Sequence, residues 1–390
     1  MDDAVSRLRR LYRSGCQESS TLSAALRAAF VSLDKATVHS ESVECSEDAE
    51  EWRQLAIQRA VYEAIFEDPV GSRFPPPSNT RQKLLKLILK ELQSGTWAAT
   101  DDDLFEACVS GLGAAGSGLE EVGGVSYDGY QCLEVTNEAC VVLRVTTHMG
   151  GEVETGCLLW TPGCTLFGLI ALGLLDDHFH GHVLELGSGT GLAGLCVGRH
   201  CGRNIERLTL TDGMPLVVSN LQHNVDATSS LEALAIPCEV SLLNWTEPSC
   251  PVLEEHPADV IIGTDVVYDL TAIDPLVSLL ETLLNKRGST SAAASSSSSS
   301  SPRSRDPCAI LAIAHRSAAT IEAFKKALGA STLILEELRF SEETWEQVRT
   351  WTCLAQDYNS LIAGVGVDDD SPPLGVHIYL ISPTHSPTSG

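Results

Sequence analysis

From residue 182 onward the chain alternates short apolar segments with segments of helical periodicity, and this alternation constrains the fold more than any other feature. Strands are predicted at 183–186, 208–211, 238–243, 259–264, 309–314, 332–338 and 376–381, and helices at 190–200, 214–225, 272–285 and 318–328. Repeated strand–helix units are typical of a parallel sheet with helices on both faces. No helical pattern separates the last two strands, so we expect a hairpin with an antiparallel edge strand. The sequence therefore predicts an α/β fold with a doubly wound, seven-stranded, mostly parallel sheet.

The preceding part of the chain is predicted to form an N-terminal helical domain, residues 1–112. Apolar residues recur at three- and four-residue spacing in 4–12, 22–33, 50–66, 79–92 and 103–112. Residues 113–129 are rich in glycine and are predicted to be a linker. In residues 130–147 apolar and polar residues alternate, which predicts two short strands. We assign residues 130–390 to the second domain.

Two segments of the second domain resemble something other than a folded core. Residues 157–175 carry no charge, a length that would suit a membrane helix. Pro162 and Gly163 interrupt the segment and no Lys or Arg flanks it, so we expect a short buried strand at 157–160 and a helix from about Cys164. Residues 287–307 surround seven consecutive serines, which cannot bury apolar surface, and are predicted to be disordered.

The formal net charge of −26 bears on the partners that the protein can bind. A strongly acidic surface repels phosphate backbones and attracts basic protein faces, although the same charge also serves solubility. The 13 cysteines include no CxxC or CxxH spacing, which excludes the common zinc patterns and favours a reducing compartment. The N-terminus lacks the apolar region of a secretory signal. We therefore expect a cytoplasmic protein that binds neither nucleic acid, membrane nor metal, and we expect a monomer.

A glycine-rich turn joins the first predicted strand of the sheet to a helix, within the segment 183–194. Such a turn allows close backbone approach and directs helix N-terminal N–H groups at a ligand. Gly189, Gly191 and Gly194 satisfy the GxGxxG fingerprint of dinucleotide sites, and Asp212 follows at the distance that fingerprint expects. In another frame, Glu185 precedes three alternating glycines at 187, 189 and 191. The turn alone leaves the cofactor open, and in both frames Asp212 is the expected partner of two ribose hydroxyls.

Residues at the ends of other predicted strands favour the second frame. Trp245 ends the third strand beside the predicted cofactor crevice, where an indole can lie against an adenine, although a lone Trp can equally cap a core. Thr264, Asp265 and Tyr268 follow the fourth strand at its carboxyl end. Trp160 precedes the helix before the glycine turn.

The order and spacing of four segments resemble those of the seven-β-strand protein-lysine methyltransferases. These segments are residues 156–160, the turn at 183–194, the triplet 243–245 and the Asp265-x-x-Tyr268 element. A looser similarity relates 74–78, Arg81 and 103–107 to the N-terminal domain of the elongation factor 2 lysine methyltransferases. The resemblance implies a Rossmann-like methyltransferase fold, S-adenosylmethionine as cofactor, and elongation factor 2 as the protein substrate.

The resemblance also implies roles for individual residues. Contacts with S-adenosylmethionine are implied for Trp160, Gly187, Ser188, Gly189, Asp212, Trp245 and Thr264, and a place beside the incoming lysine for Asp265 and Tyr268. Two positions depart from the family pattern, since Thr161 and Asn244 stand where acidic residues are usual. An amide oxygen can still accept a hydrogen bond at the second position.

Methyl transfer to lysine requires a neutral amine, whereas a free lysine has a pKa of about 10.4. Our hypothesis is that Asp265 orients the ammonium group and that Tyr268 offers a π-face and a hydroxyl. A nicotinamide-dependent oxidoreductase is the alternative enzyme, but no Tyr-x-x-x-Lys pairing follows the fourth strand. A catalytically inactive methyltransferase fold that only binds a partner is the other alternative.

Overall fold

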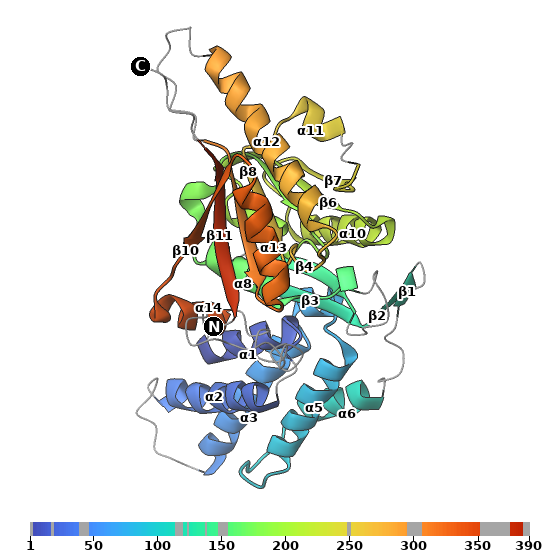
Figure 1. Cartoon of the computed structure of the whole chain (residues 1–390). Helices are drawn as coiled ribbons and strands as arrows, with labels where there is room; N and C mark the ends of the chain where they lie inside the picture. Colours follow the sequence, from blue (N-terminus) through green and yellow to red (C-terminus); the bar gives the residue numbers. More distant parts are fainter. Residues whose placement is uncertain are drawn as a thin grey trace. The chain divides into compact units, whose positions relative to one another are not determined.

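The computed structural model describes residues 3–16, 19–38, 47–113, 120–122, 125–136, 139–146, 155–247, 251–294, 306–351 and 375–384. These residues form two compact units (Figure 1). Unit 1 comprises residues 1–134 and 142–148, and unit 2 comprises 135–141 and 149–390. The unit boundary therefore lies later in the chain than the expected linker at 113–129.

Unit 1 is mainly helical. Its helices are α1 (Asp3–Arg13), α2 (Ser19–Val38), α3 (Glu47–Ile65), α4 (Pro69–Arg73), α5 (Ser78–Leu92) and α6 (Asp102–Gly113). Its strands are β1 (Glu120–Val122), which pairs with β2 (Val125–Tyr127), then β3 (Gly129–Glu134) and most of β4 (Cys140–Val145). The amphipathic periodicity of the helices buries leucines and isoleucines from several of them, among them Leu8, Leu22, Leu84, Ile88 and Leu104.

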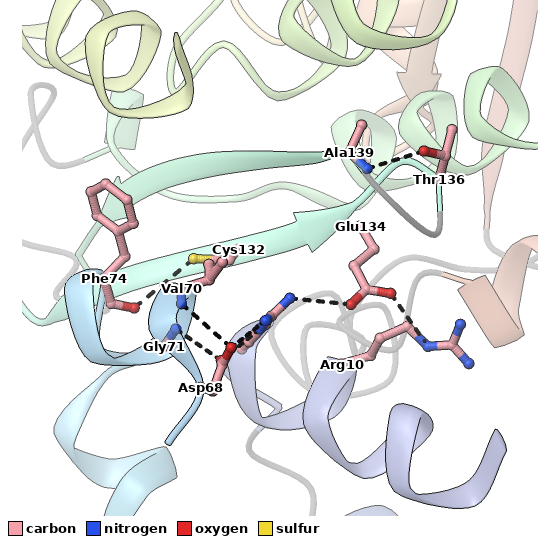
Figure 2. A network of polar contacts seen from close by, with 10 residues as sticks. Arg10, Asp68, Val70, Gly71, Phe74, Cys132, Glu134, Thr136 and Ala139 are labelled. Carbon is pink, nitrogen blue, oxygen red and sulfur yellow. Dashed lines mark hydrogen bonds and ion pairs between the residues drawn. The ribbon is translucent and has the colours of Figure 1, made fainter. Parts of the chain in front are cut away.

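A buried ion-pair network holds α1, α4 and β3 together within unit 1 (Figure 2). The Arg13 Nε donates to Asp68 Oδ2 at 2.7 Å, and the Arg13 guanidinium also reaches Glu134 at 3.4 Å. Asp68 caps α4 by accepting from the Gly71 N–H at 2.8 Å. Burial of Asp68 disfavours its charge, but the Arg13 hydrogen bonds outweigh this and hold the pKa of the carboxyl below its ordinary value. This network explains why β3, predicted to lie in the second domain, belongs to unit 1.

Unit 2 contains one seven-stranded sheet in the order β10-β11-β9-β8-β5-β6-β7. Its strands are β5 (Gly181–Leu186), β6 (Ile205–Asp212), β7 (Cys238–Leu242), β8 (Val260–Thr264), β9 (Cys308–Ala314), β10 (Leu333–Leu338) and β11 (Val376–Pro383). The five strands from β9 to β7 pair in parallel, and β11 is antiparallel to both β9 and β10. The chain leaves β5 toward one edge through β6 and then returns to β8 on its other side. This order confirms the predicted α/β fold and makes the β5–β8 junction the topological switch point.

Helices cover both faces of this sheet (Figure 1). They are α8 (Thr161–Ala171), α9 (Leu192–His200), α10 (Pro215–Leu231), α11 (Pro251–Glu255), α12 (Ile273–Ala294), α13 (Ala318–Gly329) and α14 (Glu342–Trp351), with a 3₁₀ turn η1 (Asp176–His178). Leu184 and Leu186 join a core cluster with α12 and α13. Glu185, between them, bonds to α9 at Gly194. Because successive strand residues point to opposite faces, α9 lies on the face opposite α12 and α13.

Three expectations about local structure were wrong. Residues 157–160 form no strand, and α8 begins at Thr161, because Pro162 in its first turn favours a helix start rather than a break. The antiparallel strand β11 lies inside the sheet and β10 forms the edge. Between them the chain forms α14, of which Trp345 and Val348 are buried.

The serine-rich insertion is only partly described. Helix α12 continues to Ala294, past Arg287, and residues 295–305 lie outside the described residues. None of the described helices combines the length and the apolar character that a membrane span requires.

Candidate active site

The glycine loop, residues 187–191, connects the carboxyl end of β5 to α9 at the switch point. Gly187 and Gly189 adopt φ values of 62° and 54°, in the left-handed region that L-residues with a Cβ disfavour. A Cβ on Gly189 would also lie 3.0 Å from the carbonyl oxygen of Gly156. The glycines predicted as cofactor contacts are therefore required by the loop's own backbone.

Side chains and backbone of β6 fasten this loop. The Ser188 N–H donates to the Thr211 carbonyl oxygen at 2.8 Å, and the Ser188 Oγ accepts from the Thr211 N–H at 3.1 Å. Asp212, at the end of β6, accepts from the Gly189 N–H at 3.1 Å through Oδ2 and from the Met214 N–H at 3.1 Å through Oδ1. The buried Ser188 side chain thus faces the protein, and only its backbone is placed to face a ligand.

Asp212 keeps acceptor capacity for a cofactor. A carboxylate offers about four lone-pair positions, and the backbone N–H groups of Gly189, Gly213 and Met214 use at most three of them. Burial raises the pKa of the Asp212 carboxyl, and the N–H groups of Met214 and Gly189 oppose that rise. A half-buried carboxylate with free lone pairs beside a left-handed glycine turn fits the ribose of a nucleotide cofactor.

The third glycine of the GxGxxG frame serves packing. The Gly194 N–H donates to Glu185 Oε2 at 3.2 Å, and a Cβ on Gly194 would lie 2.5 Å from the same oxygen. Glu185 is fully buried, and burial raises its pKa to about 8 although the Ser188 hydroxyl and the Gly194 N–H favour the charged form. Burial thus favours the neutral form of Glu185, and its Oε2 supports the first turn of α9 through the Gly194 N–H.

Trp245 and Val266 flank Gly187 from two other strand ends. A Cβ on Gly187 would lie 3.4 Å from Trp245 Cζ2 and 3.1 Å from Val266 Cγ1. Trp245 is half-buried and packs against the hydrophobic core, which is one of the two roles weighed from the sequence; its contact with an adenine stays a prediction. The exposed Asn244 accepts from the Thr246 N–H and hydroxyl at 3.0 and 2.8 Å. Its amide oxygen thus stabilises a local turn.

Asp265 follows β8 directly and has the only left-handed φ among the non-glycine residues described, 56°. Its N–H donates to the Ala312 carbonyl oxygen at 2.8 Å and so continues the pairing of β8 with β9 by one residue. Oδ2 accepts from Arg316 Nη2 at 2.6 Å, while the buried Oδ1 has no hydrogen-bond partner among the residues that the structure describes. Burial raises the pKa of the Asp265 carboxyl and the Arg316 charge opposes this rise. A strained residue with an unpaired buried oxygen is characteristic of functional sites.

Arg316 is the residue that the sequence interpretation missed. It follows β9 and lies with its guanidinium carbon 5.0 Å from the ring centroid of Trp160, so it bridges Trp160 and Asp265. Trp160 caps α8, and its Nε1 donates to the Thr155 carbonyl oxygen at 3.0 Å. The rule that selected Asp265, a polar residue just beyond the carboxyl end of a parallel strand, would also have selected Arg316.

The remaining predicted residues lie around this centre. Thr264 ends β8, and its Oγ1 lies 3.6 Å from the position of a Cβ on Gly163, near the start of α8. Tyr268 is 68% exposed and Leu270 is 57% exposed, so the segment after Asp265 presents two large side chains to solvent. Thr161, one of the two family departures, is buried.

A doubly wound sheet with a glycine turn and an acidic residue at its switch point defines an enzyme of the nucleotide-binding α/β class. Residues 141–303 match the family model described as lysine methyltransferase. Over this segment, which is less than half of the chain, the protein is similar to the lysine methyltransferases. Relatives named as protein-lysine N-methyltransferases support the same enzyme class, with S-adenosylmethionine as methyl donor. This similarity selects S-adenosylmethionine over the nicotinamide cofactor, a choice that the glycine loop alone left open.

Three curated relatives are similar over parts of their length. Protein-lysine N-methyltransferase EFM3 of Chaetomium thermophilum is 25% identical over 256 residues, 61% of this chain and 73% of that protein. EEF1A lysine methyltransferase 3 of Xenopus tropicalis is 31% identical over 148 residues, 38% of this chain and 61% of that protein. Protein-lysine N-methyltransferase EEF2KMT of Homo sapiens is 25% identical over 236 residues, 58% of this chain and 67% of that protein.

Proposed function

We propose that this enzyme methylates a lysine side chain of a translation elongation factor, with elongation factor 2 as the first candidate. The names of two relatives support a factor of this kind, one naming EEF1A and one naming EEF2. The net charge of −26 favours association with a basic protein face. The expected monomeric state and cytoplasmic location stay predictions, of which light scattering of the purified protein tests the first.

One observation carries the assignment of the amine site, namely the buried and only half-paired Asp265 carboxylate at the switch point. Asp265 is next to Val266, whose side chain would contact a Cβ on Gly187 of the glycine loop. An acceptor so close to the loop suits a cation that must approach the methyl donor.

Our proposed mechanism assigns a separate task to each residue. S-adenosylmethionine, when bound, supplies a methyl group on a positively charged sulfur. Gly187, Gly189, Asp212 and the backbone of Ser188 would hold the cofactor, and Trp245 would border its adenine. Asp265 accepts a hydrogen bond from the substrate amine and orients it, while Tyr268 at the surface guides the lysine stem. The lysine ammonium would release one proton to solvent, and desolvation in the site favours the resulting neutral amine, which is the form that attacks.

Arg316 adds a condition to this mechanism. Its guanidinium occupies one oxygen of Asp265 in the absence of substrate, so the ammonium either uses the unpaired Oδ1 or displaces Arg316. In both routes a cation, either Arg316 or the lysine ammonium, faces the carboxylate until the amine loses its proton.

Radiolabelled S-adenosylmethionine with purified elongation factor 2 and, separately, EEF1A tests the substrate. We expect label in elongation factor 2, and its loss in Asp265→Asn, which keeps the shape of the side chain but lacks the charge. Calorimetry should find S-adenosylmethionine binding unchanged in that variant. Label only in EEF1A would reject the named substrate, and unlabelled factors despite cofactor binding would favour the inactive alternative.

A further inference from the structure

Asp176, His200 and Cys201 meet on unit 2 at the end of α9 remote from the glycine loop. Asp176 belongs to η1, His200 is the last residue of α9, and Cys201 is its C-cap. Helix α9 has nine residues, so about 13 Å of helix separates this cluster from the loop. The proposed methyl-transfer chemistry uses none of these three side chains.

Their ligand atoms already have spacings close to those of a tetrahedral metal site. His200 Nε2 lies 3.0 Å from Asp176 Oδ1 and 3.3 Å from Oδ2, and Cys201 Sγ lies 3.7 Å from Oδ1. All three ligand atoms lie within 4.8 Å of one another. With zinc bonds of about 2.0 Å to nitrogen and oxygen and about 2.3 Å to sulfur, a tetrahedron has N···O and S···O edges of about 3.3 and 3.5 Å.

Gly173 borders the cluster, and solvent reaches the side chains of Asp176 and His200. Gly173 has a φ of +72°, and a Cβ there would lie 3.3 Å from Asp176 Oδ2 and 3.7 Å from His200 Nε2. The side chains of Asp176 and His200 are 44% and 19% exposed, whereas Cys201 is buried. A mixed O, N and S set with one solvent-facing side suits a borderline-soft cation with water as the fourth ligand.

We propose that Asp176, His200 and Cys201 bind one Zn²⁺ ion that ties η1 to the C-terminal end of α9. Binding converts the Cys201 thiol to a thiolate and releases its proton to solvent, so no redox change is involved. The ion has a structural role, because the site lies at the opposite end of α9 from the glycine loop.

Zinc binding to the purified full chain tests this proposal through competition with a chromogenic chelator. We expect one tightly held equivalent in the wild type and at least tenfold weaker binding in Cys201→Ser and in Asp176→Asn. The matched controls are Cys238→Ser, a half-buried cysteine of β7, and Asp177→Asn, the neighbouring carboxylate, and both should bind as the wild type does. Co²⁺ in place of zinc should give a thiolate-to-metal absorption band that Cys201→Ser abolishes.

Two results would overturn the zinc site. One is a wild type that takes up no zinc in competition with the chelator. The other is equal zinc affinity in the wild type and both ligand variants, which would assign the metal to other cysteines. Circular dichroism checks that Cys201→Ser, a near-isosteric change, remains folded. Because the readout is metal uptake, the outcome is independent of whether the enzyme methylates an elongation factor.

Discussion

Replacement of Arg316 by Met probes the centre of the candidate active site. Methionine keeps an apolar stem against Trp160 but removes the charge that Asp265 faces at 2.6 Å. A hydrogen bond between charged groups contributes about 1.5–3 kcal/mol, and the cation–π contact about 0.5–1 kcal/mol. The two contributions together amount to about 2–4 kcal/mol. Because the Arg316 side chain is 31% exposed, we take the lower part of this range and expect the free energy of unfolding to fall by about 2–3 kcal/mol.

The loss of stability in Arg316→Met should depend on pH, and the pKa of Asp265 determines in which direction. Asp265 has a raised pKa through burial, which Arg316 opposes, so removal of Arg316 raises it further. A carboxyl with a higher pKa in the folded than in the unfolded chain loses stability as pH rises from the unfolded value, about 3.9, to the folded one. The Arg316→Met penalty should therefore be larger at pH 8 than at pH 5.

Urea denaturation of a double-mutant cycle measures the pair. We expect Arg316→Met and Asp265→Asn to couple by about 1–3 kcal/mol, and Arg316→Lys to recover part of the loss. A coupling energy within about 0.5 kcal/mol of zero, or a penalty independent of pH, would refute the reasoning, because the two side chains would then not interact in solution.

Three further predictions concern the glycine loop and its supports. Asp212→Asn should weaken S-adenosylmethionine binding about 10- to 100-fold, as measured by calorimetry. The amide nitrogen accepts no hydrogen bond from a ribose hydroxyl or from the Gly189 N–H. Unchanged affinity would show that Asp212 does not bind the cofactor. Gly189→Ala should lower the free energy of unfolding by about 1–2 kcal/mol in denaturant titrations and reduce cofactor binding. The reason is that alanine disfavours a φ of 54° and that its Cβ would lie 3.0 Å from the Gly156 carbonyl oxygen. An unfolding midpoint equal to that of the wild type would contradict the strain argument. Glu185→Gln should flatten the pH dependence of the free energy of unfolding between about pH 4.5 and 8. The pKa of Glu185 is raised to about 8 in the folded chain, so the wild type loses stability as pH rises through that window. Parallel curves for both proteins would disprove a buried protonated Glu185.

Most of the catalytic fold could be predicted because its signals are local. Each parallel strand is an apolar run between breakers, and the register of β5 with β6 and β8 brings their carboxyl ends together whatever the side chains beyond them. The wrong expectations came from ambiguous local signals. Pro162 can end or begin a helix, and α14 buries only Trp345 and Val348 among its described side chains, which is too few for a clear pattern.

The candidate site residues that directly follow a strand could be predicted from the sequence. The contacts between their side chains could not. Positions at or just after the end of a strand identified five candidate residues, namely Gly187, Gly189, Asp212, Trp245 and Asp265. The partner of Asp265 did not follow, because Arg316 reaches it from the end of another strand.

The sequence by itself determined a mostly parallel seven-stranded sheet with a glycine-rich turn after its first strand, since glycine spacing and apolar periodicity act over a few neighbouring residues. Only the tertiary structure decided that Arg316 faces Asp265, that Glu185 is a buried strut, and that Asp176 meets His200 and Cys201. No spacing rule encodes these encounters, because they depend on how helices and strands distant in the chain are packed and on which side-chain rotamers that packing allows.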